Sequence, residues 1–274
     1  MKRVRLSYPY IFVWMPIFIV APMLFVLYYA TFKDGSFTLD YVKQVFTTSN
    51  YLPALWTSIW IALVTTAVCL ILGYPVAYIL STMKKRTAAL VSLLFIMPMW
   101  MNMLLRTFAW KIVLDKAGVF ASITEFLTGQ PAQILYTPTA VLIATIYDFL
   151  PFMILPLYTT LMKMDKSHVE AARDLGATGV QTFTKVILPL SVPGIISGIT
   201  MVFVPAMSTF AVSRMLGGGK VKMIGEVIER KIMEQNDPAI GSTLSILLIV
   251  LVLISMAIMN KVDKENSSTG GTLW

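Results

Sequence analysis

Residues 163–194, KMDKSHVEAARDLGATGVQTFTKVILPLSVPG, form a polar stretch between two long apolar runs. Within it, Ser167 stands three residues before Glu170, and Thr178 stands three residues before Gln181. A hydroxyl residue followed at this spacing by an acid or an amide is the pattern of a capping box, which starts a helix. The stretch therefore predicts two helices in tandem.

The turn between these helices and the surface of the first one can also be read from the sequence. Gly176 can adopt the left-handed conformation that closes a helix, and Pro189 should end the second helix. The first helix combines small and apolar side chains with charged neighbours, namely Glu170, Ala171, Ala172, Arg173, Asp174 and Leu175. We expect a helix-turn-helix under a membrane, with a low surface that another protein can approach closely.

The chain as a whole contains six long apolar regions, most of which lie outside this loop. A helix needs about 20 apolar residues to cross about 30 Å of hydrocarbon with its backbone groups bonded internally. The regions that reach this length are Tyr10 to Ala30, Leu52 to Leu80, Ala88 to Val113, Thr139 to Leu161, Pro193 to Ser213 and Ala239 to Asn260. Kinks are expected at Gly73-Tyr74-Pro75 and at Pro98. The pattern predicts an all-α integral membrane protein with about six transmembrane helices.

The composition agrees with lipid as the natural solvent. Of the 274 residues, 57% are hydrophobic and 13% are charged, and the mean hydropathy is +0.76. This leaves too little polar surface for a soluble globule. The net charge of +8 does not indicate nucleic-acid binding, because the Lys and Arg residues lie at the ends of apolar runs, where lipid headgroups attract them.

Basic residues also set the expected orientation. One side of the membrane receives Lys2, Arg3, Arg5, Lys84, Lys85, Arg86, Lys163, Lys166, Arg173, Lys185, Lys261 and Lys264. This side is predicted to be the cytoplasm. We expect a cytoplasmic N-terminus at residues 1–9, one transmembrane domain at 10–260 that includes the loop 163–194, and a loose cytoplasmic tail at 261–274.

The last external loop breaks the charge rule. Its basic residues are Arg214, Lys220, Lys222, Arg230 and Lys231. Apolar residues in the same loop recur at helical spacing, at Ile224, Val227, Ile228 and Ile232. This spacing favours a short amphipathic helix, which could either cap the membrane surface or contact an external partner.

Asp148 is a charge inside an apolar region. It lies about nine residues into its helix, which at 1.5 Å per residue is roughly 14 Å deep, near the midplane. A lone carboxylate there costs about 2.5 to 3.5 kcal/mol, so it should face a cavity or a partner. Pro151 and Pro156 lack the amides that would bond nearby carbonyls, including that of Tyr147. Three roles stay open: a contact for substrate, a structural pair with a basic residue such as Arg106, or a neutral buried acid.

Other polar and aromatic residues share this region and also have two interpretations. Arg106 could reach lipid headgroups or act as a gate, and the tryptophans could either pack at helix ends or stack against a cation. The candidate residues of a substrate pathway are Asp148, Tyr147, Trp100, Asn102, Arg106 and Trp110.

Several residue types in the loop 163–194 recur at fixed offsets. They are Glu170-Ala171-Ala172, Gly176-Ala177, Phe183, Ile187, Leu188-Pro189 and Pro193-Gly194. This pattern resembles the EAA loop of bacterial ABC importer permeases, and it is far more specific than one short motif. The resemblance implies a type I ABC importer permease fold, in which the segment from Glu170 to Ala177 docks in a cleft of a cytoplasmic ATPase. It also implies that the chain lies in the inner membrane of a bacterium.

Shorter matches extend over most of the chain. They are Phe37-Thr38-Leu39-Asp40-Tyr41, Leu72-Gly73-Tyr74-Pro75, Pro98, Trp100, Asn102, Arg106, Leu150-Pro151-Phe152-Met153 and Gly217-Gly218. They are similar to the B-type permeases of spermidine/putrescine importers, which implies a polyamine cargo. One position departs from that branch, because Arg214 stands where an acidic residue is expected before the glycines.

The sequence gives no sign of catalysis by this chain. The run Gly217-Gly218-Gly219-Lys220 lacks the pattern of a phosphate-binding loop, and one histidine with one cysteine makes no metal-ligand set. We therefore expect no metal, no cofactor and no enzymatic activity, with ATP and Mg on a partner ATPase. The resemblance implies as partners two copies of that ATPase, a second homologous permease, and an external or periplasmic substrate-binding protein.

Two rival interpretations follow from the same residues. The same kind of importer could carry another small solute, such as an anion. The positive charge of Arg214, at a position where an acid is expected, favours this alternative. Alternatively, the chain could be a channel or a secondary carrier that works without ATP.

Overall fold

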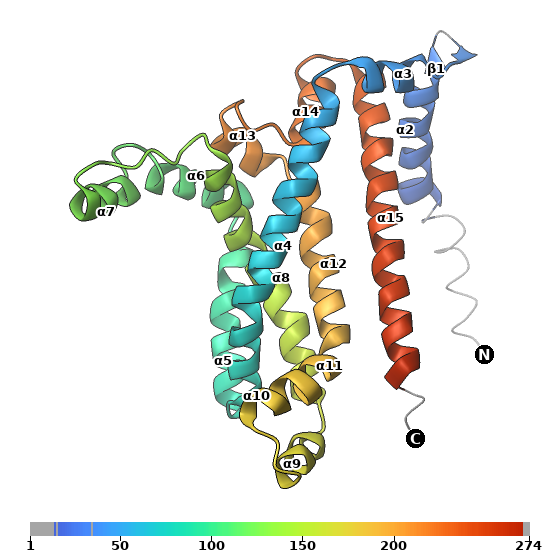
Figure 1. Ribbon diagram of the computed structural model, residues 1–274. Coiled ribbons are helices and arrows are strands. Elements are labelled where there is room, and N and C mark those ends of the chain that lie inside the picture. The colour runs from blue at the N-terminus through green and yellow to red at the C-terminus, as the bar shows by residue number, and fades with distance from the viewer. Residues whose placement is uncertain (1–13, 15, 34, 271–274) are drawn as a thin grey trace.

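The computed structural model describes residues 14, 16–33 and 35–270, and most of them are helical (Figure 1). The predicted N-terminus at residues 1–9 and the start of the first apolar region lie outside the described residues. Long helices run side by side, with shorter elements gathered at their two ends. Each end is named after a short helix that lies there. The α9 end holds α9 (Lys166–Asp174), and the α14 end holds α14 (Ile224–Met233).

Three helices form the centre of the bundle: α4 (Tyr51–Thr82), α8 (Pro138–Lys163) and α12 (Val192–Ser208). Glycines let their backbones approach closely, as small residues do between helices in membranes. A Cβ atom on Gly198 of α12 would lie 2.6 Å from the Sδ of Met153 in α8, and one on Gly73 of α4 would lie 3.2 Å from the Cγ of Met153. Met153 is fully buried, so the three helices meet around its side chain.

Within the described residues, three helices are uninterrupted spans, against about six spans predicted from the sequence. Helices α4, α8 and residues Pro238–Lys261 of α15 (Pro238–Gly270) are each long and apolar enough to cross a membrane. Two bent pairs raise the number of spans in the described part of the chain to five, if each pair is one span. The first predicted region contributes Pro16–Thr31, which is shorter than a full span.

The third predicted region is a broken span. It consists of α5 (Lys85–Ile96), the short 3₁₀ helix η3 (Met97–Trp100) and α6 (Met103–Val113). The sequence predicted a kink at Pro98, but the two halves differ in direction by 91°. The change of direction lies after Pro98, at Met101, whose backbone is extended, and Asn102. Asn102 then starts a new helix, its Oδ1 accepting a hydrogen bond from the Leu104 N–H at 2.8 Å. By contrast, α4 continues as one helix through Pro75.

The fifth predicted region ends earlier than expected. Helix α12 stops at Ser208, and the extended residue Thr209 separates it from α13 (Ala211–Gly217). The prediction of one span to Ser213 was therefore wrong. The extended backbone at Thr209 divides the apolar region Pro193 to Ser213 in two. The hydrophobic composition of this region gives no sign of the break.

At the α14 end, short elements connect the long helices. They are β1 (Phe32–Lys33), β2 (Ser36–Phe37), α3 (Asp40–Thr47) and α14 (Ile224–Met233). The chain reaches this end through η2 (Pro16–Val20) and α2 (Ala21–Thr31), which run along the bundle. The two strands pair antiparallel, with Phe32 opposite Phe37. Helices α2 and α15 lie side by side (Figure 1), and α15 continues to Gly270. The predicted loose tail is thus helical as far as that residue.

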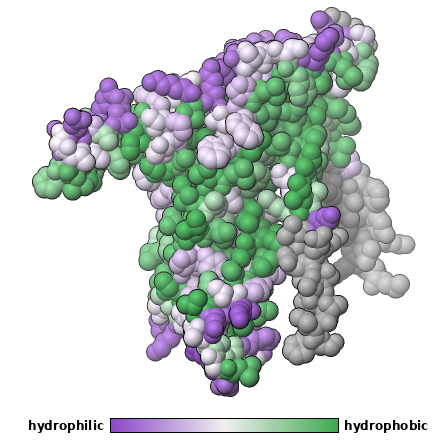
Figure 2. Space-filling model, in the orientation of Figure 1, coloured by the Kyte–Doolittle hydropathy of each residue, from purple (hydrophilic) through white to green (hydrophobic). Residues whose placement is uncertain are grey.

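The α9 end holds α9 (Lys166–Asp174), α10 (Gly179–Thr182), the π-helical turn η4 (Phe183–Ile187) and α11 (Leu188–Leu190). A side arm, made of α6 and α7 (Val119–Thr128), projects from the bundle toward the left in Figure 1. Figure 2 shows a hydrophobic middle with hydrophilic residues concentrated at the two ends. This distribution matches a chain whose middle faces lipid.

Candidate functional site

The loop at the α9 end begins with a different cap from the one predicted. Helix α9 starts at Lys166, and the Asp165 carboxylate accepts a hydrogen bond from the Ser167 N–H at 3.0 Å. Ser167 therefore lies in the first turn, and the predicted box with Glu170 is wrong. The same backbone hydrogen bond from Ser167 holds the pKa of the Asp165 carboxyl below its usual value.

The second helix start and the turn were predicted correctly. The Thr178 N–H donates to Gln181 Oε1 at 2.9 Å, and the Gln181 N–H donates to Thr178 Oγ1 at 3.3 Å, which makes a complete capping box. Gly176 has φ +82, the left-handed conformation, with open space around its Cα. Pro189 does not end the second helix, because the helical backbone continues through it to Leu190.

The loop exposes apolar side chains at the tip of the molecule. Leu175 is 89% exposed and Val180 is 74% exposed. Glu170 and Arg173 line a cavity of about 260 Å³ between α9 and the end of α4, beside Tyr78.

The second half of the loop is fastened to the bundle. The Tyr74 hydroxyl of α4 lies 2.8 Å from the Ser191 hydroxyl, and both groups are buried. The Tyr74 ring also meets the Phe183 ring edge-on, with centroids 5.6 Å apart. These contacts join the loop to α4, and Ser191 directly precedes the first residue of α12, Val192.

Inside the bundle, the predicted pathway residues Arg106 and Asp148 form an ion pair between α6 and α8. Arg106 Nε lies 3.6 Å from Asp148 Oδ1, and the side chains are 11% and 3% exposed. Neither of these two atoms makes a hydrogen bond within the described part of the chain. Asp148 is thus paired with the basic residue that the sequence named as its possible structural partner.

Four of the six predicted pathway residues lie together, and two do not. A cavity of about 260 Å³ is lined by Met101, Arg106, Ala109, Trp110, Val113 and Tyr147. The Trp110 and Tyr147 rings meet edge-on, with centroids 5.4 Å apart, and Asp148 follows Tyr147 on α8. Trp100 is 79% exposed, and Asn102 serves as the cap of α6. Met101 was missed, because nothing in its sequence context separates it from the other methionines.

The amphipathic helix predicted in the last loop exists as α14, but its apolar face packs on its own chain. Ile224 is fully buried against α4, and its backbone N–H donates to Ser58 Oγ at 2.7 Å. Val227 and Ile228 pack beside it in the same cluster. Three of the four predicted apolar residues are therefore covered by α4 and its neighbours, whereas Ile232, near the end of α14, is 36% exposed.

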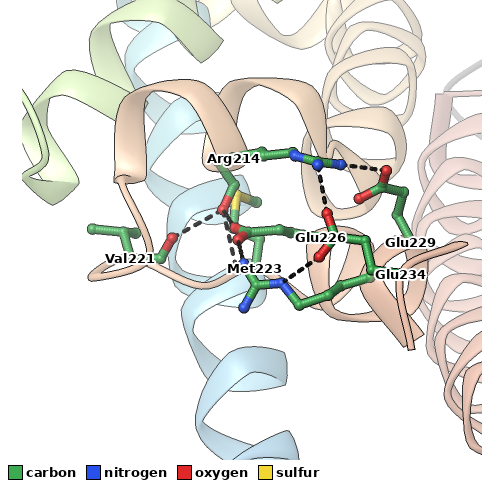
Figure 3. Close-up of polar contacts among 8 residues, drawn as sticks. Arg214, Val221, Met223, Glu226, Glu229 and Glu234 are labelled. Atoms are coloured by element: carbon green, nitrogen blue, oxygen red, sulfur yellow. Dashed lines mark hydrogen bonds and ion pairs between the residues drawn. The ribbon is translucent and has the colours of Figure 1, made fainter. Parts of the chain in front are cut away.

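Sequence reasoning missed a buried polar network beneath α14 (Figure 3). Glu226 is 1% exposed, and it accepts hydrogen bonds from Ser213 Oγ at 2.5 Å and from Arg230 Nη2 at 2.7 Å. Ser213 also accepts the Met223 N–H at 3.2 Å and lies 2.9 Å from the Val221 carbonyl oxygen. The network fixes α13 to α14. Glu226 looked like an ordinary charge of an amphipathic helix, so the sequence carried no signal for it.

Arg214 has its charge balanced by two carboxylates. Its guanidinium group binds Glu229 and Glu234 of the same loop, as Figure 3 shows. Glu234 also pairs with Arg230 at 3.7 Å. The arginine that departs from the expected acidic type is thus part of a salt-bridge cluster.

Comparison with known proteins assigns the chain to a family. The family model described as "Binding-protein-dependent transport system inner membrane component" matches residues 70–267. The spermidine/putrescine transport system permease protein PotB of Escherichia coli K12 is 39% identical over 254 residues, covering 87% of this chain and 90% of that protein. PotB of Haemophilus influenzae is 36% identical over 272 residues, covering 96% and 95%.

Solved structures support the same fold. A crystal structure of a bacterial ABC transporter that imports the acidic polysaccharide alginate has a TM-score of 0.82, with 17% identity and 96% of both chains covered. A second alginate transporter structure, in complex with a pentasaccharide-bound periplasmic protein, has a TM-score of 0.78. At this identity the likeness concerns the fold alone.

These findings exclude the interpretation as a channel or secondary carrier. They also agree with the resemblance that the loop residues indicated. The chain belongs to the binding-protein-dependent transport system inner membrane components, and it is a non-catalytic, multi-pass permease subunit of an ABC importer whose ATPase is a separate subunit.

Proposed function

We propose that this permease carries polyamines, spermidine or putrescine, across the inner membrane. The observation that supports the proposal is the sequence identity of 36–39% to spermidine/putrescine permeases over most of the chain. The importer would contain a second homologous permease, two copies of the ATPase and an external substrate-binding protein. In this arrangement the α9 end and both termini face the cytoplasm.

The loop from Glu170 to Ala177 is the proposed docking surface for the ATPase. Its apolar tip at Leu175 is exposed, and charged side chains surround it. Ser191 and Phe183 contact Tyr74 of α4, so a movement of the docked loop would displace α4 as well. Closure of the ATPases on ATP would shift the loop, and α4 and α12 would follow, which opens the pathway alternately to each side.

The proposed pathway passes the cavity lined by Trp110 and Tyr147. Aromatic faces attract cations, so this pair suits an ammonium group. Asp148 lies behind the cavity with its charge balanced by Arg106. A passing cation would therefore meet a free carboxylate only when this ion pair separates, which makes separation of the pair part of the proposed transport step.

An anionic cargo has less support. Its argument was an uncompensated Arg214, but the guanidinium group is bound by Glu229 and Glu234. Its positive charge is consequently unavailable to steer an anion.

The test uses the complete importer in nanodiscs, with purified substrate-binding protein supplied in turn with spermidine, putrescine, amino acids or small anions. ATP hydrolysis should rise with a polyamine and stay at its basal rate with the other solutes. Stimulation by an amino acid or an anion in place of polyamines would replace the proposed cargo while leaving the family assignment intact.

A further inference from the structure

The side arm turns away from the bundle at the boundary of the apolar belt. After the 91° break, α6 no longer follows the direction of α5, and α7 lies at the far end of the arm (Figure 1). One face of α6 is buried, with Thr107 1% exposed. The adjoining face exposes the apolar side chains of Leu104, Phe108 and Ile112, at 54%, 50% and 58%.

Helix α7 has the same division into two faces. Ala121 is 2% exposed on the inner face, and Thr124 Oγ1 accepts the Ala132 N–H at 2.9 Å, which ties the returning chain to this side. On the other face, Val119, Ile123 and Phe126 follow the i, i+4, i+7 spacing. They are 63%, 51% and 90% exposed, and Leu127 beside them is 73% exposed.

The position of the arm indicates what covers this face. In Figure 2, the tip of the arm is hydrophobic on its lower side, which is turned toward the apolar middle of the bundle, and hydrophilic along its upper edge. The hydrophobic side thus continues the belt that faces lipid. A partner protein docking from the aqueous side would meet the hydrophilic edge instead.

We infer that α7 is an interfacial helix whose exposed face, Val119, Ile123, Phe126 and Leu127, inserts into the outer surface of the phospholipid bilayer. An amphipathic helix lying in the membrane plane buries its apolar face at the boundary of headgroups and acyl chains and leaves its polar face in water. The arm then rests on lipid beside the bundle and supports the broken span from outside.

The test uses the assembled importer in phospholipid nanodiscs, with a nitroxide spin label attached through Phe126→Cys or Ile123→Cys. The matched control is Glu125→Cys on the polar flank of the same helix, and all three variants carry Cys69→Ala. At each position, the accessibility to oxygen, which partitions into lipid, is compared with the accessibility to a water-soluble nickel complex. Retained substrate-stimulated ATPase activity shows that each variant is assembled.

Labels at positions 126 and 123 should collide several-fold more often with oxygen than with nickel, and the label at 125 should show the reverse order. Low accessibility to both reagents at 126 and 123 would mean that a second protein covers this face, which overturns the inference. Higher accessibility to nickel than to oxygen at 126 and 123 would mean that the face lies in water, and this result also overturns it.

Discussion

Arg106 and Asp148 join the broken span to α8 inside the bundle, with Nε and Oδ1 3.6 Å apart. The pair neutralises two charges that would each be costly in a membrane interior. It also holds α6 at the break, where the backbone has just changed direction. One contact thus balances charge and fixes the geometry of the arm.

The first prediction separates the structural role of this pair from a role in transport. Arg106→Gln or Asp148→Asn alone should lower the thermal unfolding midpoint of the purified permease. Removing one partner of a buried pair leaves the other charge uncompensated, at a cost of about 3–5 kcal/mol before relaxation. The double variant should recover most of the midpoint.

Uptake by the double variant then decides the role of the carboxylate. If Asp148 contacts a cationic cargo, spermidine uptake should stay roughly 5- to 30-fold low, because about 1–2 kcal/mol of attraction is lost. Full recovery of uptake in the double variant would restrict Asp148 to pairing with Arg106.

The second prediction concerns the loop at the α9 end. Glu170→Lys and Gly176→Glu should abolish uptake and weaken co-purification of the ATPase, because one reverses a charge and the other adds bulk at the docking surface. The bundle should stay folded, since Glu170 is exposed and a side chain at Gly176 would meet no neighbouring atom. Because Gly176 has φ +82, Gly176→Glu also strains the turn itself, so Glu170→Lys is the cleaner of the two variants. Gln130→Lys, a charge change on the exposed arm, serves as the control. Normal ATPase binding by both loop variants would refute the docking assignment.

The third prediction tests the orientation with thiol labelling of intact cells. A cysteine at Lys220 should react with an impermeant maleimide from outside, and one at Val180 should react only after permeabilisation. Both positions are exposed. Lys220 is a better probe than Gly218, because a side chain at Gly218 would collide with the Tyr136 ring. The opposite labelling pattern would reverse the proposed topology.

The fourth prediction compares the contributions to stability of two salt-bridged residues at the α14 end, the buried Glu226 and the exposed Arg214. Glu226→Ala should destabilise the permease by about 1–3 kcal/mol, because it removes the buried carboxylate that accepts hydrogen bonds from Ser213 and Arg230. Arg214→Ala should cost less than about 1 kcal/mol, because its side chain is 46% exposed and water screens its ion pairs. Thermal unfolding midpoints measure both changes, and equal effects would contradict the importance given to burial.

Local signals in the sequence were sufficient for the helix-turn-helix but not for every cap. The box formed by Thr178 and Gln181 and the left-handed Gly176 depend on neighbours within a few residues, so the pattern predicted them. At the first helix, Asp165 and Ser167 are both suitable caps two residues apart. Only the backbone geometry decides in favour of Asp165.

Longer-range features could not be predicted in the same way. The run through Pro98 has the same composition whether it is straight or bent by 91°, so hydropathy could not give the angle. Arg106 and Asp148 are far apart in the sequence, and their pairing depends on that bend. The burial of Glu226 likewise depends on how α13 returns toward α14.

The contact of Met153 with Gly73 and Gly198 bears on how the three central helices can slide. Glycine has no side chain to interlock with a groove, and methionine adapts its three rotatable bonds to a changing gap. Small shear displacements at this crossing therefore meet a smooth surface instead of a series of steps. Among the contacts of the central helices, this crossing is therefore where we expect a sliding movement to meet the least steric resistance.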